Sequence, residues 1–366
     1  MKIMMKDIVV AEYEPINGLV AVLREDLMPH ALFLEEGDDF DARYNNRTNF
    51  EFWCASRVLS LDRVHAKEIL NSCGLSQAQT DRDRCQVALR YHCLSLADSF
   101  WVQQDDEDLR WEDVCLFNHS LNEVVVDVSL SGKNYSITNT ELIAPDCSTP
   151  GVFPKAWVRE EDGFYLYKGD VNGSVQREVE ASKILQKLGI PVLNYDYAEW
   201  GGQVTSKCKL FTSPDVGLVT AEHYGYNNEV GPLLDENFHY LNLATFLVGD
   251  SDKHMGNWGF LFDENGIIGF APLMDFNHAF EARVDSLSLP NQFIGKKCNQ
   301  LEAAVEAMKH VALKDADLSE FHYGEFVKER MAVLEKALSV DGIIQNAEER
   351  TAASVGDAKD RDLEMR

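Results

Sequence analysis

The stretch from Phe246 to Phe280 constrains the fold of this 366-residue chain more than any other. It reads FLVGDSDKHMGNWGFLFDENGIIGFAPLMDFNHAF, with polar clusters at 250–257 and 275–277 and apolar segments at 258–262 and 267–274. The tetrapeptide DENG at 263–266 separates the apolar segments, and Asn265-Gly266 suits the positive φ of a primed hairpin turn. The pattern predicts a strand, a tight turn and a second strand, which would bring the two polar clusters together.

Three oxygen-bearing side chains of these clusters would then point into one space: Asp252, Asn257 and Asp275. Two carboxylates and an amide oxygen are hard ligands, and they suit Mg²⁺ that is bound together with substrate phosphates. The spacing from Asp252 to Asn257 resembles that of the protein-kinase catalytic loop. There the aspartate acts as the base, while the asparagine and a later aspartate hold the metal. The match is incomplete, because no His-Arg pair precedes Asp252 and D-F-N replaces D-F-G at 275–277.

The loop resembles that of the HipA-like serine/threonine kinases more closely, in which it reads N-x-D-R-H-x-x-N. This chain departs from that pattern at Asp250 and Lys253, and it keeps His254 after the aspartate. The resemblance implies a two-lobed kinase fold that uses ATP and Mg²⁺ and phosphorylates serine or threonine of a protein substrate. Some members of that family are toxins paired with a DNA-binding antitoxin, so the resemblance also implies such a partner here. We count His254 among the nucleotide-site residues on the same basis.

The net charge of −27 argues against direct binding to nucleic acid or to an anionic membrane, which demand a basic surface. A partner that is itself basic is not excluded. No apolar run reaches the length of a transmembrane helix, and residues 1–14 lack the features of a signal peptide. The eight cysteines form no C-x-x-C pair, which disfavours a zinc ribbon or redox motif. We therefore expect a reduced, cytoplasmic protein.

Residues 1–130 are predicted to form an N-terminal accessory domain of α/β character. Segments 3–10 and 19–23 suit strands or short helices, residues 35–47 suit a loop, and residues 49–71 have helical apolar spacing. We find no catalytic constellation in this region. A kinase domain is predicted at 131–345, with an N-lobe at about 131–212 and a C-lobe at about 213–345. Residues 346–366 are charged and are expected to be a disordered tail.

The segment 144–157 is rich in small residues and contains Gly151 and Lys155. Such a segment can form a flap over phosphates, with backbone N–H groups and an ammonium group directed at them, although its prolines also suit an ordinary loop. The HipA-like phosphate loop ends in G-x-x-x-K in the same way. A serine of that loop can be autophosphorylated in the family, and Ser148 falls at the matching place.

Two strands are expected at 156–159 and 164–168, and a helix is expected at 176–188 with Gly189 past its end. Lys168 stands at the end of a strand, where an exposed edge lysine and the phosphate-binding lysine of kinases are alternative interpretations. Glu178 and Glu180 both flank the apolar face of the helix, so either carboxylate can reach inward to the lysine. The resemblance favours Glu178.

Further strands are expected at 192–200 and 203–211, which would complete a lobe of five strands. The second of these ends near Lys209 and Phe211, and it should lead into a hinge that holds adenine, so both residues join the predicted nucleotide site. Residues 213–231 suit a linker, and residues 238–248 have helical spacing. After 280 the chain is predicted to be mostly helical.

Together these patterns predict an α+β chain with a two-lobed, protein-kinase-like fold: a β-rich N-lobe, a helical C-lobe and an additional N-terminal region. The predicted catalytic residues are Lys168, Asp252, Asn257 and Asp275. One alternative is a kinase-shaped module that binds nucleotide or a partner without transferring phosphate. The other is a metal-dependent hydrolase that uses Asp250, Asp252, His254 and Asp275.

Overall fold

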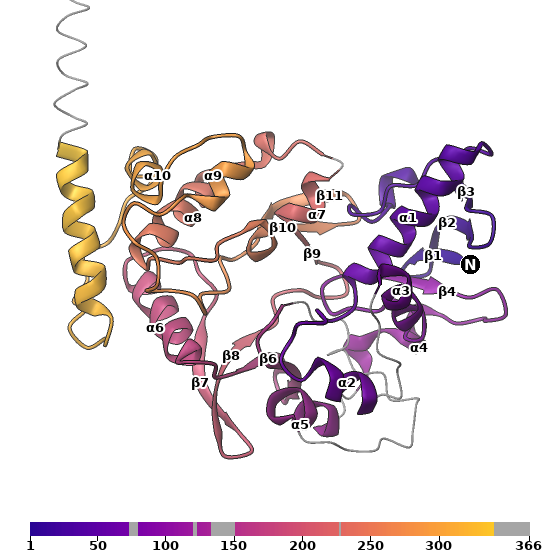
Figure 1. The fold of residues 1–366 in the computed structure, drawn as a ribbon, viewed down its shortest axis with the longest axis horizontal. Coiled ribbons are helices and arrows are strands. Elements are labelled where there is room, and N and C mark those ends of the chain that lie inside the picture. The colour runs from indigo at the N-terminus through magenta and orange to yellow at the C-terminus, as the bar shows by residue number, and fades with distance from the viewer. Residues whose placement is uncertain (73–79, 120–122, 133–150, 227, 340–366) are drawn as a thin grey trace, which may run out of the picture. The chain divides into compact units, whose positions relative to one another are not determined.

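The computed structural model describes residues 1–72, 80–119, 123–132, 151–226 and 228–339 (Figure 1). These residues form two compact units. The first contains Met1–Lys183, Val192–Leu234 and Lys253–Asn277, as far as these ranges are described. The second contains Ile184–Pro191, Asp235–Asp252 and the described residues from His278 onward. The predicted phosphate-loop serine, Ser148, and the tail at 346–366 lie outside the described residues, and the predicted domain limits stay a prediction.

The N-terminal part of the first unit is built on a four-stranded antiparallel sheet with the order β3-β2-β1-β4. Its strands are β1 (Lys2–Met5), β2 (Ile8–Glu14), β3 (Leu19–Val22) and β4 (Phe100–Gln103). Segments 3–10 and 19–23 are therefore strands rather than helices. Helix α1 (Phe40–Ser56) lies beside this sheet (Figure 1), and the rings of Tyr13 and Phe50 join them with centroids 4.2 Å apart.

Helix α1 overturns the prediction of a loop at 35–47, because it begins at Phe40. The Asp39 side chain caps it by accepting a hydrogen bond of 2.9 Å from the Ala42 N–H. Asn46 is fully buried inside the helix, and its side-chain amide pairs with both backbone groups of Glu35 and with the Gly18 carbonyl. A buried polar side chain of this kind costs little because every group finds a partner.

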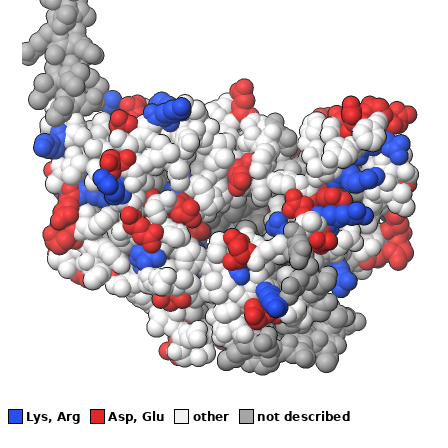
Figure 2. Space-filling model, in the orientation of Figure 1, with Lys and Arg blue, Asp and Glu red and all other residues white. Residues whose placement is uncertain are grey.

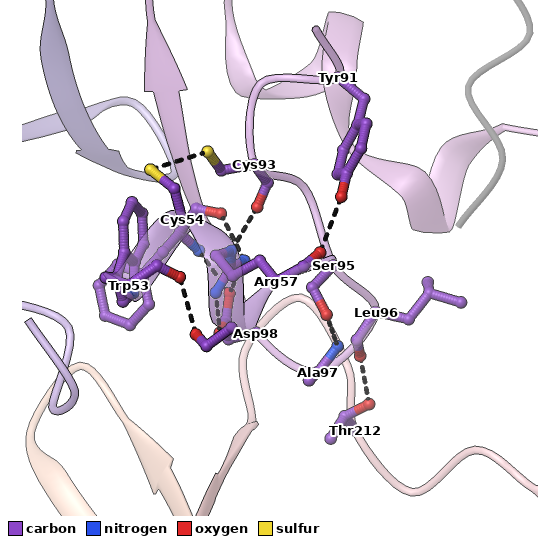
Figure 3. Close-up of polar contacts among 12 residues, drawn as sticks. Trp53, Cys54, Arg57, Tyr91, Cys93, Ser95, Leu96, Ala97, Asp98 and Thr212 are labelled. Carbon is purple, nitrogen blue, oxygen red and sulfur yellow. Dashed lines mark hydrogen bonds and ion pairs between the residues drawn. The ribbon is translucent and has the colours of Figure 1, made fainter. Parts of the chain in front are cut away.

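A buried ion pair ties the end of α1 to the segment that precedes β4 (Figure 3). The Arg57 guanidinium donates two hydrogen bonds of 2.8 Å to the Asp98 carboxylate, and it also donates to the carbonyls of Cys93 and Phe100. Burial opposes the charge of Arg57, but Asp98 outweighs burial and raises the pKa of Arg57 above its ordinary value. The Tyr91 hydroxyl closes the network by donating to the Arg57 carbonyl at 2.8 Å.

The remaining short helices of the N-terminal part connect these elements. They are the 3₁₀ turns Glu25–Leu27 and Leu116–Asn118 and the helices α2 (Ala66–Ser72), α3 (Asp81–Leu89), α4 (Trp111–Val114) and α5 (Glu123–Ser131). Helix α5 packs against the second sheet of the unit through an apolar cluster. That cluster contains Val126, Leu130, Ala156 and Tyr167.

The second sheet is antiparallel with the order β5-β6-β8-β7. Its strands are β5 (Lys155–Glu160), β6 (Gly163–Gly169), β7 (Tyr195–Trp200) and β8 (Gln203–Lys209). The strands predicted at 156–159, 164–168, 192–200 and 203–211 are present, and the sheet contains four strands among the described residues. The expected total of five stays a prediction, because residues 133–150 lie outside the described residues. Helix α6 (Ser174–Lys187) lies between β6 and β7 in the chain, close to the predicted 176–188.

The hairpin predicted around 263–266 is present as β10 (Gly259–Asp263) and β11 (Gly266–Phe270). These strands join β9 (Gly217–Thr220) in an antiparallel sheet with the order β11-β10-β9. The turn lies at the predicted 263–266, but its conformation differs from the primed turn expected of Asn265-Gly266. Asp263 pairs with Gly266, so Glu264 and Asn265 form the turn, and of these four residues only Gly266 has a positive φ, at +114°. The region expected to be a linker at 213–231 contains β9 and helix α7 (Ala221–Gly225).

The second unit is mainly helical. Helix α8 (Glu236–Leu247) is apolar on almost every side and buried, and it is joined by α9 (Leu289–Phe293), α10 (Gln300–Ala307) and a helix over 324–339. Two short 3₁₀ helices, Gly231–Leu233 and Met255–Asn257, lie in the first unit. No helix among the described residues combines the length and apolar character needed to cross a membrane. The described cysteines are free thiols: Cys54, Cys85, Cys93, Cys115, Cys208 and Cys298.

Candidate functional site

A buried lysine stands at the centre of the site. Lys168, near the end of β6, donates to the Glu178 carboxylate at 2.5 Å and to the Asp275 carboxylate at 3.0 Å. Burial would lower the pKa of Lys168, but Asp275 and Glu178 outweigh it and raise that pKa well above its usual value. The structure thus brings together a strand lysine, a carboxylate of α6 and the aspartate that follows the hairpin. Glu180, the rival of Glu178, instead accepts from Gln176 at 2.9 Å.

A second lysine lies directly across the sheet from the first. Lys155, the first residue of β5, is the cross-strand partner of Lys168, and both side chains are buried. Like charges in this arrangement are destabilising by themselves. Burial is the main reason that the pKa of Lys155 falls to about 8. Asp275 opposes that fall, and the cations of Lys168 and Arg63 add to it.

The Lys155 ammonium group makes no hydrogen bond or ion pair with any described residue. The Lys168 ammonium group, in contrast, donates to both Glu178 and Asp275. It lies against Gly151, where a Cβ atom would come within 2.4 Å of the lysine Nζ. Gly151 also has a φ of +97°, a conformation that other residues rarely adopt. A glycine therefore leaves room for this ammonium group, which is in direct contact with no described carboxylate.

The backbone of Asp275 is held in a left-handed conformation, with φ at +62°. The Asp275 N–H donates to the Tyr195 hydroxyl at 3.2 Å, and the Lys253 ammonium donates to the carbonyls of Asp275 and Met274 at 2.5 and 2.8 Å. Lys253 is fully buried and lies 4.3 Å from the centre of the Phe276 ring. Because backbone and carboxylate are both held, the side chain of Asp275 has a fixed direction.

The Asp275 carboxylate is kept charged by its surroundings. Burial would raise its pKa, but Lys168, Lys155 and Lys253 outweigh burial and hold the pKa below its usual range. The carboxylate is thus ionised throughout the physiological range, as a metal ligand must be.

The loop residues divide between the two units. Asn257 and His254 belong to the first unit, and Asn257 ends the 3₁₀ helix Met255–Asn257. His254 caps this helix, because its Nδ1 accepts from the Gly256 N–H at 3.0 Å. Asp252 belongs to the second unit, where its own N–H donates to the Asp250 carboxylate at 2.9 Å.

The two residues predicted to flank adenine are found at the end of β8 and just after it. The Lys209 ammonium is exposed and pairs with the Asp162 carboxylate at 2.8 Å, in the turn between β5 and β6. Phe211 is half-buried. The side chain of Lys209 is therefore directed to a surface ion pair.

Three residues around the cluster were not singled out from the sequence. They are Tyr195 and Lys253, which hold the Asp275 backbone, and Ser206, whose hydroxyl donates to Glu178 at 2.7 Å. Lys253 had a signal, since a lysine stands where the resembling family has arginine. No sequence pattern singles out Tyr195 or Ser206. They are ordinary strand residues, and only the pairing of the strands places them beside the site.

The residues present fit a hard divalent cation held together with phosphates. Asp275 and Asn257 offer a carboxylate and an amide oxygen, and Mg²⁺ commonly takes only one or two protein ligands beside phosphate and water. The described residues contain no group of three or more His, Cys, Asp or Glu side chains that could hold a metal ion by themselves. Nothing in the described chain favours the set of ligands that the alternative hydrolase requires.

The charge of the described surface is mixed on the face that Figure 2 shows. Figure 2 shows Lys and Arg side chains in small groups beside acidic ones over the described residues of the face in view. The surroundings of Asp275 are different, because they contain the buried cations of Lys155, Lys168 and Lys253. This local positive charge lies in a chain whose net charge is −27.

No protein-family model matches the chain, and no curated protein matches it. Several solved structures are similar, and two of them are described here. One is the proinflammatory kinase CtkA of Helicobacter pylori, with 16% identity and a TM-score of 0.39 over 53% of this chain and 95% of that one. The other is a complex of HipA, HipB and operator DNA, from a toxin–antitoxin system of Shewanella oneidensis MR-1. Its matched chain has 14% identity and a TM-score of 0.49 over 92% of this chain and 99% of that one. One of these structures contains a HipA chain, the kind of protein that the loop resembles.

Proposed function

We propose that the chain is a protein kinase that uses ATP and Mg²⁺ and transfers the γ-phosphoryl group to a serine or threonine hydroxyl of a protein. The observation that carries this proposal is the cluster of Lys155, Lys168, Glu178 and Asp275. Two buried lysines face each other across β5 and β6. Both carboxylates accept hydrogen bonds from Lys168. The other ammonium group is in direct contact with no described carboxylate, although Asp275 favours its charge, and a polyphosphate would supply a direct partner.

Each residue has a defined task in this proposal. Lys155 and Lys168 attract the phosphates, and Glu178 keeps Lys168 in place. Asp275 and Asn257 would hold Mg²⁺, which when bound neutralises charge that develops on the transferring group. Asp252 orients the acceptor hydroxyl and accepts its proton. Positioning and fixed charges supply most of the acceleration in phosphoryl transfer, so a cluster that is already ordered suits the reaction.

The direct test is incorporation of phosphate from labelled ATP, with and without Mg²⁺, followed by intact-mass and peptide mass spectrometry. We expect Mg²⁺-dependent incorporation into the chain itself, with Ser148 as the expected site, or into an added protein acceptor. Binding of ATP without any incorporation or ADP release would favour the alternative of a nucleotide-binding module. A toxin role and a DNA-binding antitoxin partner stay predictions from the loop resemblance.

Changing Asp252 to asparagine should lower phosphate transfer about 10²–10⁴-fold, the usual contribution of a positioned general base. ATP binding should be nearly unchanged, because the lysines and Asp275 are untouched. Phosphate incorporation and the nucleotide-induced shift of the unfolding temperature measure the two effects on the same preparation. Transfer at the wild-type rate would remove Asp252 from the proposed role.

The affinity for ATP should fall as the pH rises above about 8. Lys155 loses its proton near that pH in the free protein, while bound phosphates favour the charged ammonium and raise its pKa. Binding above pH 8 therefore requires uptake of a proton, and the dissociation constant should rise about ten-fold between pH 7 and pH 9. Titration of Mg²⁺·ATP by calorimetry measures this. Lys155→Met should bind more weakly with a flat profile, and an equal slope in the two proteins would contradict the assignment.

A further inference from the structure

The N-terminal accessory region, in which we find no catalytic constellation from the sequence, contacts the segment that carries Gly151 and Lys155. The contacts come from residues 60–64, which we call the brace. The Ser60 hydroxyl accepts from the Gly151 N–H at 3.3 Å, and the Val64 N–H donates to the Val152 carbonyl at 2.8 Å. Two residues of the brace therefore bind the backbone of the adjacent residues Gly151 and Val152.

Arg63 makes the third contact of the brace. Its guanidinium donates to the Lys155 carbonyl, and the side chain is almost fully buried, with 3% of its surface exposed. The brace is itself a compact turn, because the Arg63 N–H donates to the Ser60 carbonyl at 3.1 Å and the Ala66 N–H donates to the Arg63 carbonyl at 3.0 Å. Hydrogen bonds within its own backbone therefore hold the turn in shape.

Two consequences follow for the ammonium group of Lys155. The backbone of this residue is held by Arg63 on one side and by the β5–β6 pairing on the other. Gly151, which lies within contact distance of the ammonium group, is held by Ser60. The direction in which Lys155 presents its charge is therefore set jointly by β5 and by the accessory region.

The same accessory region also contacts the segment that follows β8. The Thr212 hydroxyl donates to the Leu96 carbonyl at 2.6 Å (Figure 3), and the Leu218 N–H donates to the Ala97 carbonyl at 2.7 Å. Asp98, which follows these two residues in the chain, is held by its ion pair with Arg57. Both segments that the sequence assigns to nucleotide binding, 151–155 and the one after Lys209, are thus in contact with this region.

We propose that the accessory region is an integral part of the nucleotide site and that Arg63 is a positioning residue for Lys155. The inference rests on the proposed function, since it assigns Arg63 to the binding of the phosphates of ATP. It predicts that damage to the brace weakens the binding of ATP while leaving the transfer step and the fold largely intact.

The test compares steady-state kinetics of full-length variants. Arg63→Met should raise the KM for ATP about ten-fold, because it removes a charged hydrogen bond from the Lys155 backbone. The kcat should change much less, and Arg63→Lys should restore part of the affinity. Ser60→Ala, which removes one neutral acceptor, should raise KM two- to three-fold. If Arg63→Met fails to fold, Ser60→Ala and Arg63→Lys still carry the test.

The matched control is Arg84→Met. Arg84 also belongs to the accessory region and donates to a backbone carbonyl, that of Val58, at 3.2 Å, but it makes no described contact with residues 151–155. Its KM for ATP should stay at the wild-type value. Folded Arg63→Met and Ser60→Ala proteins with wild-type KM would overturn the inference while the proposed function stands. A wild-type chain that does not bind ATP would overturn both.

Discussion

Replacement of Asp275 by asparagine is expected to reduce phosphate incorporation to the background of the assay. The substitution keeps the shape of the side chain and removes its charge, so it deletes a proposed metal ligand and one of the two carboxylates on Lys168. The buried cations that now hold Asp275 ionised, Lys168, Lys155 and Lys253, would lose a shared counterion. Labelled ATP measures the loss of transfer, and thermal unfolding without nucleotide measures the accompanying loss of stability.

Asp263→Asn is the control for this substitution. Asp263 ends strand β10 of the same hairpin, and its carboxylate accepts only from Asn265, at 2.7 and 3.5 Å, among the hydrogen bonds of the described residues. Transfer should be unchanged in this variant. Substantial transfer by folded Asp275→Asn protein would show that the cluster around Lys168 is structural, and the proposed function would lose its main support.

The second large effect is expected in stability rather than in activity. Arg57→Met should destabilise the fold by about 3–5 kcal/mol, because it leaves the Asp98 carboxylate buried without its partner. Asp98 is 9% exposed, and after the substitution it would keep only the Phe100 N–H, which donates at 3.0 Å. Denaturation by urea, followed by tryptophan fluorescence, measures the change.

Arg24→Met provides the comparison, because Arg24 forms an ion pair of similar length with Asp26, at 2.7 Å, on the exposed surface. Water screens that pair, so the free energy of unfolding should hardly change. If both substitutions had the same small effect, the network in Figure 3 would contribute no more than a surface pair.

Local patterns in the sequence predicted the elements around the site well. The strand that carries Lys168, the helix that carries Glu178 and the hairpin that precedes Asp275 are all present, with limits that differ by a few residues. These elements have clear apolar periodicity, and short turns fix their register. The order of charged residues along the chain was visible for the same reason.

Features that depend on distant partners were missed. The first turns of α1 read as a loop because residues 38–49 are polar, with several asparagines. Asn46 is nevertheless buried in the helix, because Glu35 and Gly18 supply partners for its amide. The contacts of Arg63 with Lys155 and of Tyr195 with Asp275 span 92 and 80 residues of the chain, and no local pattern encodes contacts of that kind.

The hairpin turn lies at the predicted 263–266, but Asn265 and Gly266 are not its two central residues. Asn265-Gly266 is a strong signal for a primed turn, but the strands pair so that Glu264 and Asn265 form the turn. An irregularity in the pairing between Leu261 and Phe262 accompanies this arrangement. The pairing of the whole hairpin, rather than the preference of one dipeptide, decided the register.

The ammonium groups that face each other across β5 and β6 bear on the order in which ligands arrive. A bare divalent ion that approaches Asp275 meets repulsion from Lys155, Lys168 and Lys253, the three cations that depress the pKa of its carboxylate. A polyphosphate is drawn inward by the same charges. Under the proposed function, we therefore expect Mg²⁺ to bind as its complex with the nucleotide rather than as the free ion. The concentration of free Mg²⁺ would then affect this chain only through the amount of that complex.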